Sequence, residues 1–137
     1  MLQWEAPAFD SPFELWREDG VLHLVLAKGG RMRVAHMKEI LRLIAALDRG
    51  GRVPVMIDHA HGVVVEEDAR RLLTRACRSQ GHPLAVYSTD RECRDQLDVF
   101  RTVHRPAFPF RVFERREEAF RWARERRQLS ALKTDRP

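Results

Sequence analysis

The chain has 137 residues, 44% of them hydrophobic and 33% charged, with a formal net charge of +5. This length predicts one domain with a substantial core. Charged residues interrupt every apolar stretch before the roughly 18 residues that a membrane-spanning helix needs. The first ten residues lack the basic start and apolar stretch of a signal peptide, so we expect a cytoplasmic protein. In that compartment Cys77 and Cys93 should be buried thiols rather than a disulfide.

The positive charge lies mainly near the C-terminal end, where residues 111–137 carry a net charge of +4. Only three of the 25 basic residues are lysine, which indicates a GC-rich genome more than selection for nucleic-acid contacts. A basic segment of this size attracts phosphates without specificity. We therefore expect no specific nucleic-acid partner.

The first elements in chain order are an arm and a hairpin. Residues 1–12 contain two prolines and little periodicity, and are expected to form an N-terminal arm. An edge strand is predicted over residues 13–18, where Phe13, Leu15 and Arg17 alternate with Glu14, Trp16 and Glu18. Asp19-Gly20 is a strong signal for a two-residue turn, so the apolar run 21–26 should pair antiparallel with that strand.

A helix and a buried strand follow the loop 28–31. One apolar face with helical spacing is formed by Val34, Met37, Ile40, Leu41, Ile44 and Leu47. Gly50-Gly51 should end this helix. Residues 53–57 are predicted to form a short buried strand, and residues 58–65 the loop after it.

Two further helices and a strand are predicted from residue 66 to residue 103. Acidic residues 66–68 complement the dipole at a helix start. The buried face of that helix should contain Ala69, Leu72, Leu73, Ala76 and Cys77. Residues 83–87 form the next strand, and Thr89 with Glu92 fits a capping box for the helix after it. The inner face of that helix should contain Cys93, Leu97, Phe100 and Val103.

The chain closes with a strand at 110–113 and a helix that Glu117 and Glu118 open. Its inward stripe should contain Ala119, Trp122, Ala123 and Leu129. Strands that alternate with helices predict an α/β domain, because crossover helices must cover a largely parallel sheet. We expect one domain over residues 13–129, with about five strands and four helices in the order β-β-α-β-α-β-α-β-α, and a frayed basic tail at 130–137.

This order resembles the STAS domain, the family of SpoIIAA-like anti-sigma factor antagonists. Residues 53–58 (VPVMID) resemble the family's apolar strand that ends in aspartate before its functional loop. Residues 110–113 (FRVF) and 117–122 (EEAFRW) resemble its closing strand and helix. The resemblance implies a mixed sheet with helices mainly on one face, and a regulatory protein-interaction module that is not an enzyme.

Antagonists of this family carry a phosphorylated serine or threonine near that aspartate. Here no serine or threonine occurs from residue 12 to residue 73, so phosphorylation at the usual site is not expected to switch binding. Glu66 or Glu67 could supply a permanent negative charge, but ordinary acidity at a helix start is the favoured explanation. The resemblance implies a partner-binding surface formed by Asp58, His59, His61, Val65, Glu66, Glu67 and Arg70. Its partner would be an anti-sigma factor or another signalling protein.

Two alternatives to a protein-interaction module stay open. Lipid or nucleotide binding in a pocket between sheet and helices, as occurs among STAS-like proteins, would make this a small-ligand binder. Asp58, His59 and His61 could instead act as metal ligands or acid-base groups of an enzyme. No fourth ligand and no neighbouring nucleophile are evident, so we expect neither a metal nor a cofactor. The loop 28–31 could cradle an anion but lacks phosphate-loop spacing.

A homodimer is plausible through the arm and first strand. Phe9, Phe13 and Trp16 are the candidate contacts, because an exposed tryptophan beside a second aromatic residue is typical of interfaces. The arginine-rich last helix has the i, i+4 charge pairing of a solvated helix, such as Glu117 with Arg121.

Overall fold

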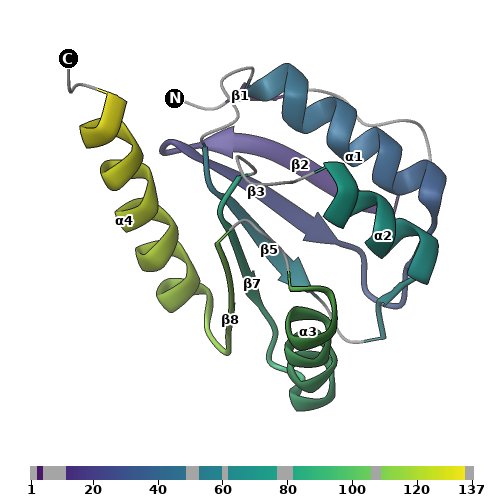
Figure 1. The fold of residues 1–137 in the computed structure, drawn as a ribbon. Helices are drawn as coiled ribbons and strands as arrows, with labels where there is room; N and C mark the ends of the chain where they lie inside the picture. Colours follow the sequence, from purple (N-terminus) through teal and green to yellow (C-terminus); the bar gives the residue numbers. More distant parts are fainter. Residues whose placement is uncertain are drawn as a thin grey trace.

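The structure is a computed structural model that describes residues 3–4, 12–48, 53–59, 62–76, 82–105 and 109–134. Its main sheet contains β1 (Gln3–Trp4), β2 (Phe13–Glu18), β3 (Val21–Leu26), β5 (Val55–His59), β7 (Leu84–Tyr87) and β8 (Phe110–Phe113), in that spatial order (Figure 1). The helices are α1 (Val34–Leu47), α2 (Glu67–Ala76), α3 (Arg91–His104) and α4 (Arg116–Thr134). The predicted mixed α/β sheet with four helices is confirmed.

The hairpin at the start of the domain has the predicted register. β2 pairs antiparallel with β3, so that Glu18 lies opposite Val21 across the turn. Asp19 and Gly20 have φ angles of 56° and 75°, the left-handed conformations that a two-residue turn of this kind requires. The pairs β3–β5, β5–β7 and β7–β8 are all parallel, as crossover helices demand.

Strand alternation gives the sheet two different faces. The larger core cluster lies on the face that α1, α2 and α3 cover, and includes Leu15, Leu24 and Leu43. The smaller cluster lies under α4 on the opposite face and includes Val21, Ala119 and Trp122 (Figure 1). Three of the four helices therefore share one face, in line with the arrangement that the STAS resemblance implies.

Short strands occur where the sequence predicts loops. β4 (Arg31–Met32) pairs parallel with β6 (Val64–Val65) in a separate two-stranded sheet. β1 belongs to the predicted arm but pairs antiparallel with β2, so that Trp4 lies opposite Trp16. The predicted strand 53–57 corresponds to β5, which begins at Val55 and ends at His59. α4 continues to Thr134, into the segment 130–137 that was predicted as a frayed tail.

Several helix ends and faces differ from the prediction. The N-cap of α3 is Asp90, whose Oδ1 accepts from the Glu92 backbone N–H at 2.9 Å, so the capping box at Thr89 is wrong. Val103 is exposed rather than part of the inner face. Leu43 in α1 is fully buried although the predicted stripe missed it. Gly50, Gly51 and Cys77 lie outside the described residues, as does the side chain of Leu129.

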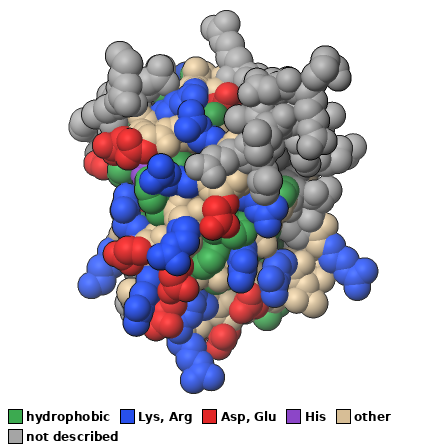
Figure 2. Space-filling view, turned by 90° about the vertical axis from the view of Figure 1, so that its left-hand side faces the viewer, with side chains coloured by type: hydrophobic (Ala, Val, Ile, Leu, Met, Phe, Trp, Pro, Cys, Tyr) green, Lys and Arg blue, Asp and Glu red, His purple; other side chains and the backbone are tan. Residues whose placement is uncertain are grey.

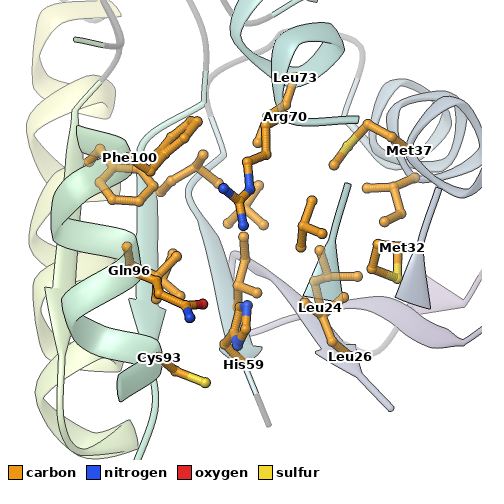
Figure 3. Close-up of a pocket in the computed structure, with 18 of the residues that line it drawn as sticks. Leu24, Leu26, Met32, Met37, His59, Arg70, Leu73, Cys93, Gln96 and Phe100 are labelled. Atoms are coloured by element: carbon orange, nitrogen blue, oxygen red, sulfur yellow. The ribbon is translucent and has the colours of Figure 1, made fainter. Parts of the chain in front are cut away.

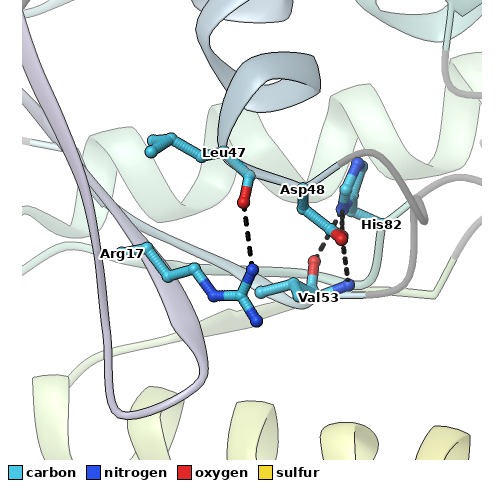
Figure 4. Close-up of polar contacts among 5 residues, drawn as sticks. All are labelled: Arg17, Leu47, Asp48, Val53 and His82. Atoms are coloured by element: carbon cyan, nitrogen blue, oxygen red, sulfur yellow. Dashed lines mark hydrogen bonds and ion pairs between the residues drawn. The ribbon is translucent and has the colours of Figure 1, made fainter. Parts of the chain in front are cut away.

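Polar contacts hold the C-terminal end of α1 against the sheet (Figure 4). The Asp48 carboxylate accepts from the Val53 backbone N–H at 2.8 Å and lies 3.6 Å from His82 Nδ1. The same His82 nitrogen lies 2.7 Å from the Val53 carbonyl oxygen, and Arg17 donates to the Leu47 carbonyl at 3.0 Å. Arg17 thus satisfies a carbonyl that the end of α1 leaves without a helical partner, and Asp48 ties the segment before β5 to the same helix end.

Candidate functional site

A cavity of about 90 Å³ lies between the sheet and helices α1, α2 and α3 (Figure 3). The sheet contributes Leu24, Leu26, Val55, Ile57, His59, Leu84, Val86 and Phe110, and the small sheet contributes Met32 and Val65. The helices contribute Met37, Ile40, Ile44, Arg70, Leu73, Cys93, Gln96, Leu97 and Phe100. Nearly all of these side chains are apolar, so the interior of the cavity favours an apolar group.

Local periodicity explains why these residues meet. Alternate residues of a strand point to one face, so Leu84 and Val86 of β7 face the cavity while Ala85 faces α4. On α3, Cys93, Leu97 and Phe100 follow helical spacing and reach the cavity together. Much of the cavity lining therefore consists of apolar residues from the predicted strands and helix faces.

Three polar side chains also line the cavity. Arg70 extends from α2 toward His59, which lies at the end of β5 with 7% of its surface exposed (Figure 3). Gln96 approaches from α3. None of the described lining residues is Asp or Glu, so the only permanent charge in this lining is the Arg70 guanidinium.

Arg70 makes no ion pair within the parts of the chain that the structure describes. Helical spacing would pair it with Glu66, four residues earlier. Instead the Glu66 carboxylate lies 3.6 Å from Arg33 Nε and 3.9 Å from Arg31 Nη1, which the β4–β6 pairing brings beside it. The neighbouring Arg71 does follow the helical rule and pairs with Glu67 at 2.8 Å.

Cys93 lies at the edge of the cavity as a buried thiol. Burial raises the pKa of this thiol, and the nearby Asp90 carboxylate raises it further. The thiolate is the nucleophilic form of cysteine, so Cys93 is a poor nucleophile at neutral pH. Its contribution to the site is apolar surface.

The structure does not bring Asp58 and His59 together. They are consecutive residues of β5 and point to opposite faces, His59 into the cavity and Asp58 toward Tyr87 and Arg116 near α4. Burial, followed by the charge of Asp58, raises the pKa of Tyr87 to about 12. His61 lies outside the described residues. Among the described ranges no three His, Cys, Asp or Glu side chains are grouped as a metal site would require.

The other predicted partner-surface residues have mixed positions. Val65 is half-buried and lines the cavity, while Glu66 and Glu67 pair with arginines at the surface. Val64, beside them in β6, is 46% exposed. The sequence pattern does not single out Gln96, an exposed residue at the rim of the cavity, although its spacing from Cys93 and Phe100 places it next to the buried stripe of α3.

The predicted dimer contacts also differ in accessibility. Phe13 is 3% exposed within the core, so its side chain offers no surface to a second copy. Trp16 is half-buried on the opposite face, where it stacks on His23 with ring centroids 5.4 Å apart and donates to Glu18 at 3.2 Å. Phe9 lies outside the described residues. A dimer contact through Trp16 stays a prediction.

The face under α4 is rich in aromatic and arginine side chains. His23 lies between Trp16 and Phe120, at 5.9 Å from the latter ring. The guanidinium carbons of Arg116 and Arg124 lie 5.8 and 5.7 Å from the same Phe120 ring. Outside this layer, Figure 2 shows basic and acidic side chains intermingled. Such mixing is typical of a solvated surface, and the described residues in this view form no single-sign patch for nucleic acid.

Comparison with known proteins identifies the fold but no activity. An uncharacterised protein of the DUF3478 family from Shewanella loihica PV-4, described as having a SpoIIAA-like fold, superimposes with a TM-score of 0.60 and 13% sequence identity. The match covers 81% of this chain and 91% of that one, which confirms the STAS-like fold predicted from the sequence. No curated protein matches this chain.

Across the described residues no helix combines the length and apolar character needed to cross a membrane. The model of a family described as a domain of unknown function (DUF7793) matches residues 15–127. That range includes the main strands from β3 onward, helices α1 to α3 and the cavity between them. The chain therefore belongs to the DUF7793 family and has a SpoIIAA-like fold.

Proposed function

We propose that this protein is a non-enzymatic binding module that takes up a small, largely apolar ligand between its sheet and helices α1 to α3. The observation that carries the proposal is the apolar cavity of about 90 Å³ at that position. One water needs roughly 10–15 Å³ of such space, so the cavity has room for a group of about six heavy atoms. A closed core would have argued against a ligand.

The cavity supports binding rather than catalysis. Its lining offers apolar surface and three polar groups, and Cys93, the thiol at its edge, is held in the protonated form. The acid-base pair considered in the sequence, Asp58 and His59, is divided between the two faces of the sheet. Both observations favour a module that binds its ligand unchanged.

The test uses benzene and 1-hexanol as apolar probes, followed by methyl NMR of the whole chain. We expect saturable shifts confined to cavity methyls, such as those of Leu24 and Ile57. Leu97→Trp should abolish them, because the added ring enters the cavity from α3. The matched control is Val99→Trp on the same helix, where the side chain is 60% exposed. Absence of binding to the wild type, or equal binding to Leu97→Trp, would contradict the proposal.

A second candidate function is the regulatory protein-interaction module that the STAS resemblance implies. The observation in its favour is the exposed Val64, which lies beside Glu66 and Glu67 at the start of α2. Exposed apolar side chains within a charged rim are typical of partner contacts. This surface is also part of the one predicted from the sequence.

Affinity capture from native cells tests the second candidate. Wild type should retain a signalling protein in near-equal amount, and Val64→Asp should lose it. Val103→Asp is the matched control, because Val103 is an exposed valine on the distant helix α3. Replacing Glu66 and Glu67 by alanine then tests whether their negative charge contributes to partner binding, measured as recovery of the captured protein. Equal recovery with Val64→Asp would contradict the assignment of this surface.

A further inference from the structure

We propose that the ligand is an anionic amphiphile, namely a short- to medium-chain carboxylate, and that Arg70 binds its carboxylate. This inference rests on the proposed binding function and specifies the class of ligand. The alkyl chain would occupy the apolar part of the cavity. The carboxylate would lie against the guanidinium.

The first argument is the charge of the cavity. Arg70 is half-buried, and no described carboxylate compensates its charge. A charge removed from water without a partner is unfavourable, and protein interiors normally supply the partner. Here the acid at the helical position, Glu66, is engaged by Arg31 and Arg33. A ligand carboxylate would supply the missing negative charge.

The second argument is the shape of the polar groups. A guanidinium presents a planar fork of donors that matches a carboxylate in two parallel hydrogen bonds. Gln96 lies on the same cavity and can add a side-chain donor. In Figure 3 the Arg70 guanidinium descends between Phe100 and Gln96 on one side and Leu24, Met32 and Met37 on the other. An alkyl chain extending from the carboxylate would therefore meet apolar side chains at once.

The third argument is size. A space for about six heavy atoms admits one short alkyl chain but excludes the two long chains of a phospholipid. The proposal therefore commits to a free single-chain acid. Hexyl phosphate is the comparison probe, because it has the same alkyl chain as 1-hexanol but a tetrahedral, doubly charged head group.

The experiment measures binding of hexanoate, hexyl phosphate and 1-hexanol to the full chain by calorimetry at pH 7 and low salt. We expect hexanoate to bind roughly ten- to hundredfold more tightly than 1-hexanol, as a charge-assisted hydrogen bond allows. Arg70→Gln should remove that difference and leave 1-hexanol binding unchanged. Arg71→Gln, which removes the same charge from the exposed side of α2, should preserve it.

The outcomes separate the two proposals. Equal affinity for hexanoate and 1-hexanol, unchanged in Arg70→Gln, would overturn the role of Arg70 and leave the apolar site standing. A clear preference for hexyl phosphate would overturn the carboxylate. No binding of any probe would overturn both proposals. If Arg70→Gln does not fold, the Nε–Hε resonance of Arg70 in the wild type decides, because it should shift with hexanoate and stay unchanged with 1-hexanol.

Discussion

The two faces of the main sheet are packed in different ways. Under α4, small residues allow the helix to approach closely, with Ala85, Ala119 and Ala123 all fully buried. Under α1, α2 and α3, long side chains such as Met37 and Phe100 surround a cavity. Strands β3, β5 and β7 each contribute to both faces, since adjacent residues such as Leu84 and Ala85 of β7 face opposite ways. We infer that the α4 face is the more closely packed one, whereas the opposite face combines the larger core cluster with the cavity proposed for binding.

The largest effect is expected from Trp122→Ala on the α4 face. Trp122 is 7% exposed and contacts Phe113 with ring centroids 6.0 Å apart. Removing a buried tryptophan leaves a void and costs about 3–5 kcal/mol. Urea denaturation measures the loss. Leu97→Ala changes a half-buried residue at the edge of the cavity and should lower the free energy of unfolding by less than Trp122→Ala does. An equal or larger loss would contradict the closer packing of the α4 face.

Enlarging adjacent residues of β7 should sharpen the same contrast. Ala85→Val adds volume beneath α4 and is expected to cost about 1–3 kcal/mol through overpacking. Val86→Ile adds one methyl group toward the cavity and should be neutral or slightly stabilising, because space is present there. Thermal unfolding of the two variants compares them directly. Similar destabilisation by both would show that the cavity side is packed as closely as the other.

Acid should weaken the α4 face through His23. Burial lowers the pKa of His23, against the opposing hydrogen bond to the Glu18 carbonyl, and the charge of Arg116 lowers it further. Below about pH 6.5 the His23 side chain binds a proton more readily in the unfolded chain than in the folded chain. The free energy of unfolding therefore decreases as the pH falls. Glu18 and Asp19 attract a proton and reduce the effect.

The variant His23→Phe keeps an aromatic ring between Trp16 and Phe120 but cannot titrate. Its urea midpoint should decrease less than that of the wild type between pH 7.5 and pH 5.5. Parallel decreases in the two proteins would exclude His23 as the cause of acid sensitivity.

The smallest effect is expected at the surface of α2. Arg71 and Glu67 form a 2.8 Å ion pair, but their side chains are 62% and 67% exposed. Solvent screens such a pair, so Arg71→Gln should cost only about 0.3–0.5 kcal/mol. Urea unfolding at low and high salt measures this. A cost above 1 kcal/mol would show that this ion pair is not screened as its exposure implies, and would disqualify Arg71→Gln as a control for Arg70.

Local signals in the sequence were sufficient for the main elements. Asp19-Gly20 specified both turn and register, and apolar spacing located α1 and α3. The pairing of β4 with β6 was not predictable in this way, because each strand has two residues and the partners are distant in sequence. That pairing brings Arg31 and Arg33 to Glu66, so it could not be predicted that Arg70 lacks an ion pair among the described residues.

The Asp58–His59 pair shows a different limit. The two residues are adjacent in sequence and were grouped with His61 on that basis. Once β5 continues to His59, alternation sends the two side chains to opposite faces. Extending the predicted strand by two residues would have been enough to separate them. The cavity, in contrast, depends on how three helices pack, which residue spacing does not specify.

The β2–β3 hairpin has a consequence for the order of folding. It joins strands across a two-residue turn, so its contacts require almost no loop closure. Each parallel pair instead waits for a crossover segment that contains a whole helix. Hairpins form in about 1–10 μs, and non-local pairings are slower. The hairpin is thus available as an early template, whose β3 edge then accepts β5 and, in turn, β7 and β8.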